Sequence, residues 1–74
     1  MDFSIGDKVF LMKPLPYLKT AEPMPMLRPP DLVSSEDVGE IVGFNSQNTA
    51  EVRFRRGTFL IPGEYLSKDI REKE

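Results

Sequence analysis

Residues 50–61 of the chain read AEVRFRRGTFLI. Over residues 50–55, apolar and charged side chains alternate, which is the pattern of a β-strand with one face in a core and the other in water. Residues 56–57 then form a short turn, and residues 58–61 resume a β-rich run, so the stretch predicts a β-hairpin. The inward face of its first strand is expected to carry Ala50, Val52 and Phe54.

Three further β-rich segments surround this hairpin. Residues 8–13, 38–44 and 67–70 are expected to be strands, while residues 45–48 form a hairpin turn and residues 62–66 a single helical turn. The two glycines within residues 38–44 indicate a bulge or a close crossing of another strand. The expected core consists of Val9, Phe10, Leu11, Ile41, Val52, Phe54, Phe59 and Ile61.

Residues 14–30 hold six of the seven prolines of the chain. Proline fixes φ and lacks an amide donor, so no regular helix or central strand is expected there. The segment also carries more apolar surface than a solvated spacer needs, in Leu15, Tyr17, Leu18, Met24, Met26 and Leu27. We therefore expect a stiff loop over about residues 14–37, pinned by alternate side chains. Such a loop is either a recognition surface or a lid over one end of the domain.

The order of these elements predicts an all-β fold, a small SH3-like barrel of about five short strands with one long proline-rich loop and a short helical turn near the C-terminus. Residues 57–66 resemble the closing segment of SH3 domains. The chain, residues 1–74, is expected to be a single domain with a frayed charged tail at residues 71–74.

Composition limits the function classes. The chain has 10 Lys and Arg against 12 Asp and Glu, a net charge of −2, and neither Cys nor His. This charge balance gives no general attraction to nucleic acid or anionic membranes, and the missing residue types disfavour zinc sites and most catalytic pairs. We expect a monomeric, soluble, cytoplasmic protein without metal or cofactor that is not an enzyme and does not insert into membranes.

Residues 17–31, YLKTAEPMPMLRPPD, resemble the hallmark of the SipA family of small cyanobacterial regulatory proteins. Further similarity lies in residues 5–9, 38–41, 52–54 and 57–60. The resemblance implies an SH3-like adaptor that binds the ATP-binding domain of the sensor histidine kinase NblS and modulates its autophosphorylation under light and nutrient stress.

The proline segment is the expected partner-binding surface, because a stiff loop loses little entropy on docking and Met and Arg are common at adaptable interfaces. Its candidate residues are Tyr17, Lys19, Met24, Met26, Leu27, Arg28, Pro29 and Pro30. Secondary candidates on the hairpin are Arg53, Arg55 and Arg56.

Two alternative functions stay open. The chain could be a peripheral subunit of a photosynthetic membrane complex, or an RNA-binding barrel of the KOW type that uses the arginines. RNA binding is disfavoured because Phe54 points inward and Glu51 shares the face of the arginines. Tyr17, Pro62 and Tyr65 could line a peptide groove like that of SH3 domains, but the chain has no Trp, so this role is not favoured.

Overall fold

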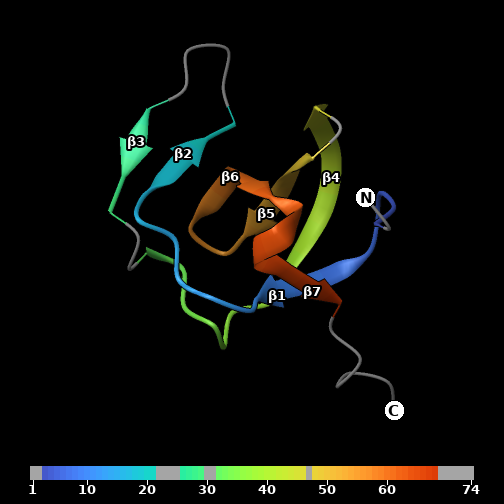
Figure 1. Ribbon diagram of the computed structural model, residues 1–74, viewed down its shortest axis with the longest axis horizontal. Helices are drawn as coiled ribbons and strands as arrows, with labels where there is room; N and C mark the ends of the chain where they lie inside the picture. The colour runs from blue at the N-terminus through green and yellow to red at the C-terminus, as the bar shows by residue number, and fades with distance from the viewer. Residues whose placement is uncertain (1–2, 22–25, 30–31, 47, 69–74) are drawn as a thin grey trace.

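The computed structural model describes residues 3–21, 26–29, 32–46 and 48–68. Within these residues, seven antiparallel strands form one curled sheet in the order β3-β2-β6-β5-β4-β1-β7 (Figure 1). The strands are β1 (Lys8–Leu11), β2 (Leu18–Thr20), β3 (Leu27–Arg28), β4 (Gly39–Ser46), β5 (Thr49–Phe54), β6 (Gly57–Pro62) and β7 (Leu66–Lys68), with a 3-10 turn η2 (Gly63–Tyr65) before β7. The predicted all-β, SH3-like fold is confirmed, with seven strands in place of about five.

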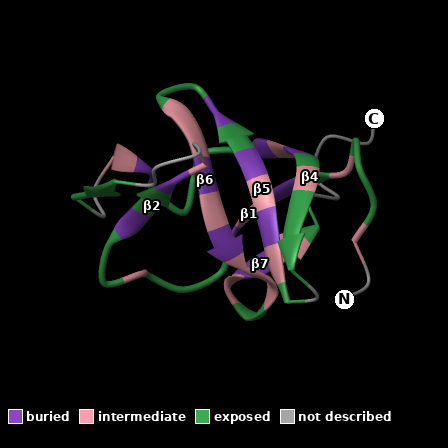
Figure 2. Cartoon of the chain, turned by 90° about the horizontal axis from the view of Figure 1, so that it is seen from above, coloured by how far each residue is buried: buried purple, intermediate pink, exposed green. Residues whose placement is uncertain are grey.

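The β5–β6 hairpin is the centre of the sheet. Its register runs from Thr49 opposite Pro62 to Phe54 opposite Gly57. Gly57 has a φ of +144°, which a residue with a side chain rarely adopts, so the glycine fits this position in the turn. The alternation of residues 50–55 predicted the facing correctly, because Ala50, Val52 and Phe54 are all buried (Figure 2).

Strand β4 is bent by two irregularities in its pairing with β5, one between Ile41 and Gly43 and one further on. Gly39 packs closely against core side chains: a Cβ there would come within 2.6 Å of Val52 Cγ1 and 2.8 Å of Phe54 Cε1. The prediction of a bulge or a close crossing at the glycines is therefore confirmed. β4 also continues through Ser46, so the predicted turn over residues 45–48 is shorter than expected.

The core holds seven of the eight predicted residues. Phe10 is the exception, because its neighbours Val9 and Leu11 both point inward and the strand alternation leaves Phe10 only partly buried. Four buried hydrophobic residues complete the core, namely Leu18, Val33, Ala50 and Leu66. Leu18 and Val33 come from the segment predicted as a loop, which therefore contributes to the core as well as covering it.

The proline segment contains two short strands, so the prediction of an irregular loop over residues 14–37 is wrong in part. β2 pairs with β6 on one side and with β3 on the other. The prolines do not prevent this, because none of them falls within β2 or β3 and the residues of these strands keep their amide donors. The Thr20 amide, for example, donates to Met26 O at 2.9 Å.

The last strand begins at Leu66, one residue before the predicted start at residue 67, and the structure describes it as far as Lys68. Residues 69–70 of the predicted strand and the tail at 71–74 lie outside the described residues. Among the described residues, no helix has both the length and the apolar character needed to cross a membrane.

Candidate functional site

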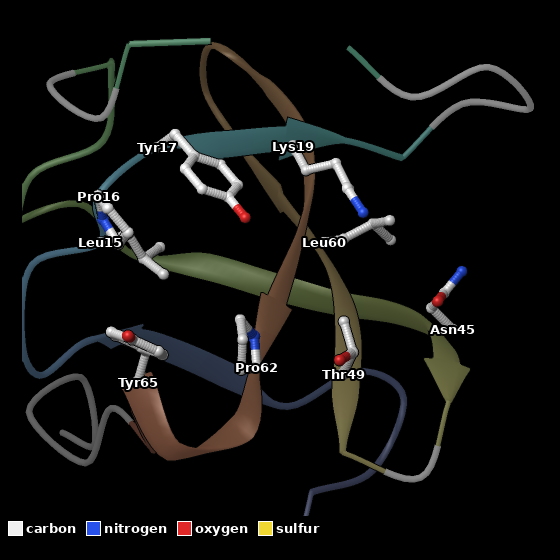
Figure 3. A pocket seen from close by; sticks show the side chains of 9 residues that line it. All are labelled: Leu15, Pro16, Tyr17, Lys19, Asn45, Thr49, Leu60, Pro62 and Tyr65. Atoms are coloured by element: carbon white, nitrogen blue, oxygen red, sulfur yellow. The ribbon is translucent and has the colours of Figure 1, made fainter. Parts of the chain in front are cut away.

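A groove of about 230 Å³ lies on the outer face of the sheet, where β2, β5 and β6 meet η2 (Figure 3). Figure 3 shows side chains around an open centre, with the Tyr17 hydroxyl pointing toward that centre. The groove is lined by Leu15, Pro16, Tyr17, Lys19, Asn45, Thr49, Leu60, Pro62 and Tyr65. Two predicted partner-binding residues, Tyr17 and Lys19, are thus brought into one concave site.

One wall of the groove is built by the start of β2. Because Leu18 and Thr20 point into the core, the alternation of the strand turns Lys19 to the outer face. There Lys19 lies opposite Leu60 of β6, which is itself turned outward between buried Phe59 and Ile61. The β2 wall therefore combines an aromatic ring, from Tyr17, with a cation.

The opposite wall is formed by the end of β6 and by η2. Pro62 closes β6 with φ −61° and ψ 140°, an extended conformation that proline favours. Two backbone hydrogen bonds hold η2 at its ends: the Gly63 amide donates to Asn48 O at 2.7 Å, and the Met12 amide donates to Tyr65 O at 2.8 Å. Since both ends of η2 are bonded to residues that flank strands of the sheet, Met12 after β1 and Asn48 before β5, Pro62 and Tyr65 are held in place before any partner arrives.

The residues that line the groove include a cation. Lys19 lines it, and Lys13 Nζ lies 5.1 Å from the centroid of the Tyr65 ring, within the range of a cation–π contact. No Asp or Glu is among the described residues that line it. Two acidic residues lie close to the groove without lining it: Glu64 of η2 is exposed beside Tyr65, and Glu51 pairs with Leu60. The Glu51 carboxylate lies over Gly43 of β4, however, on the side of β5 away from Lys19, with Oε1 3.0 Å from where a Gly43 Cβ would be.

The remaining predicted residues of the proline segment lie at or beyond the edge strand β3. Leu27 pairs with Lys19, so it continues the outer face next to the groove, and it is 62% exposed. Met26 is half exposed, and its amide donates to Thr20 Oγ1 at 2.8 Å. Arg28 and Pro29 are exposed outside the groove lining. Met24 and Pro30 lie outside the described residues.

The three secondary arginines do not share one set of contacts. Arg53 forms an ion pair with Glu40 on the neighbouring strand at 3.0 Å. Arg55 and Arg56 instead line a separate hollow that also includes Asp37. Phe54, which lies between Arg53 and Arg55 in the sequence, is buried and therefore not available for base stacking.

The sequence does not predict the part of the groove that depends on how β5 pairs with β6. Thr49 and Asn45 reach the site because the β4–β5 turn lies beside Pro62, and no local pattern shows this pairing. Leu60 could have been found, because the buried residues on both sides of it fix its direction. The sequence indicates Tyr17, Pro62 and Tyr65 as possible groove residues without favouring that role, and the structure places all three in one groove.

Comparison with known proteins assigns the family. The model of the CRR42-like family, described as "Protein CHLORORESPIRATORY REDUCTION 42-like", matches residues 5–66, and the chain therefore belongs to this family. No curated protein and no solved structure matches the chain. The assignment to the SipA family is wrong, since the family model that matches nearly the whole chain is a different one.

Proposed function

We propose that this protein is a non-enzymatic, peripheral component of a photosynthetic membrane complex that takes part in chlororespiratory reduction, and that it contacts the complex through its outer groove. The family name supports the chlororespiratory context. The same finding overturns the predicted role as an adaptor of a sensor histidine kinase in two-component signalling, because it rested on resemblance to another family. The alternative of a peripheral subunit fits this family better.

The groove is the structural feature that supports binding to a partner most directly. Tyr17, Pro62 and Tyr65 present rigid apolar surface, and each tyrosine adds a hydroxyl that can form a hydrogen bond. Tyrosine is enriched among the residues that dominate binding energy at protein interfaces. Because the η2 wall is held by backbone hydrogen bonds, docking would cost little ordering of the protein.

Several features favour a protein partner over RNA. Stacking of bases needs exposed aromatic rings within a basic surface, whereas here Phe54 is buried and Arg53 is paired with Glu40. Tyr17 and Tyr65 line a hollow instead of a flat strand face, and the exposed Phe44 lies apart from them on β4. That the protein is a monomer, lies in the cytoplasm and has no enzymatic activity stays a prediction.

Native gel analysis of photosynthetic membranes tests this proposal. A tagged copy of the chain replaces the native one in a photosynthetic host, and the membranes are solubilised with a mild detergent. We expect the tag to co-migrate with a large complex of the photosynthetic membrane, and we expect chlororespiratory reduction to fall when the gene is deleted. A tag found only at low mass, together with normal chlororespiratory reduction in the deletion strain, would refute the proposal.

A further inference from the structure

The outer groove has a lysine and no acidic residue among the described residues that line it. Resting on the proposed function, we propose that its ligand is an extended acidic segment of a partner protein, which lays apolar side chains against Tyr17, Pro62 and Tyr65 and places a carboxylate at Lys19. This inference goes beyond the family assignment, because it identifies the partner by the chemistry of its binding segment.

The first observation that supports the proposal is that Lys19 has no ion pair among the described residues. The described residues give ion pairs for Arg53 with Glu40 and for Lys68 with Asp7, but none for Lys19 or Lys13. Lys19 is in the groove lining, whereas Lys13 lies against the Tyr65 ring and lines a neighbouring hollow that shares Leu15 with the groove. The overall charge of the chain is −2, so a cation in the groove lining is a local feature and not a consequence of composition. Complementary charge mainly sets specificity and association rate.

The second support is the shape of the site. Tyrosine and proline side chains on two facing walls form the kind of surface that receives an extended backbone. Leu27 continues the outer face beyond Lys19, so an extended segment leaving the groove across β2 would meet a further apolar side chain. A membrane surface would not fill a concave site of this kind, which makes a peptide the better occupant.

Peptide titration with the purified full chain tests the proposal. The probe is a fluorescein-labelled peptide of about eight residues, in which prolines keep the backbone extended and leucines alternate with glutamates. Two matched peptides carry Gln or Lys in place of Glu. The protein variants are Lys19→Glu at the groove and Lys8→Glu as the control, since Lys8 is an exposed lysine on β1 outside the groove.

We expect the glutamate peptide to bind about tenfold more tightly than the glutamine peptide, with the lysine peptide weakest. Lys19→Glu should reverse the order of the glutamate and lysine peptides, whereas Lys8→Glu should leave it unchanged. A charge swap of this kind cannot arise from unfolding, because an unfolded variant would bind neither peptide. Equal binding of all three peptides, an unchanged order in Lys19→Glu, or binding to anionic vesicles without binding to any peptide would overturn the inference.

The two proposals fail separately. If the peptides do not discriminate while the tagged chain still co-migrates with a photosynthetic complex, the acidic ligand is wrong and the function stands. If the peptides discriminate but the tag migrates alone, the groove chemistry stands and the assignment to the complex is wrong.

Discussion

Tyr17 and Tyr65 lie on opposite walls of one groove, although the first precedes β2 and the second belongs to η2 near the end of the described chain. Neither wall exists in isolation. The pairing of β2 with β6 and the hydrogen bond from Met12 to Tyr65 O bring them together. The site is therefore a product of the folded sheet and depends on its stability.

The first prediction concerns the close packing of Gly39 against the core. Gly39→Ala should destabilise the protein by about 1–3 kcal/mol, because its Cβ would overlap Val52 and Phe54 in the packed core. Gly43→Ala is the matched control. Its Cβ would meet only the flexible Glu51 carboxylate, which can move aside. Urea unfolding of the two variants checks this, and equal midpoints would contradict the packing described.

The second prediction concerns the core. Phe54→Ala should lower the free energy of unfolding by about 3–5 kcal/mol, since it removes a ring that is 5% exposed. A domain this small has a total near the lower end of about 5–15 kcal/mol, so the variant should be largely unfolded at room temperature. Circular dichroism measures this, and a native spectrum would show that the side chain contributes less to the core than its burial indicates.

The third prediction concerns the attachment of β3. Thr20 is buried, and its Oγ1 accepts the Met26 amide. Thr20→Val keeps the shape but removes this acceptor, which should cost about 1–3 kcal/mol locally. Amide hydrogen exchange at Met26 and Leu27 should accelerate, while exchange in β5 stays slow. An unchanged rate at Met26 would mean that the hydrogen bond does not hold the hairpin.

The fourth prediction concerns the surface ion pair. Arg53→Ala should change the free energy of unfolding by less than about 1 kcal/mol, because the Arg53 side chain is 61% exposed and such pairs contribute little. Thermal melts at low and high salt check this. A loss of several kcal/mol would show that the pair has a structural role that its exposure does not indicate.

The central hairpin could be predicted from the sequence because apolar and charged residues alternate along its first strand, which gives the direction of each side chain in turn. Once Ala50, Val52 and Phe54 are assigned inward, the directions of the neighbouring residues are determined, and the buried side chains agree. The prediction that Phe10 lies in the core is wrong because residues 9–12 are an unbroken apolar run, which does not show which side chains point inward. In the structure, Val9 and Leu11 are the buried residues of this strand.

The groove could be predicted only in part. β2 and β3 have three residues and two residues respectively, too few to show a period, and the surrounding prolines argued against any strand. Thr49 and Asn45 depend on cross-strand register, which sequence patterns do not report. The kinase partner was wrong because a shared fold and a proline-rich block do not specify a partner.

The central claim is that the groove contacts a protein of the photosynthetic membrane, and Tyr17→Ala tests it most directly. Tyr17 is 49% exposed, so its loss should change stability by only about 0.5 kcal/mol. Ile5→Ala is the control, since Ile5 is 67% exposed and outside the groove. Purified variants are titrated onto membranes from the deletion strain. We predict at least roughly thirtyfold weaker binding for Tyr17→Ala and normal binding for Ile5→Ala. Equal affinity of Tyr17→Ala and the wild type would contradict the account.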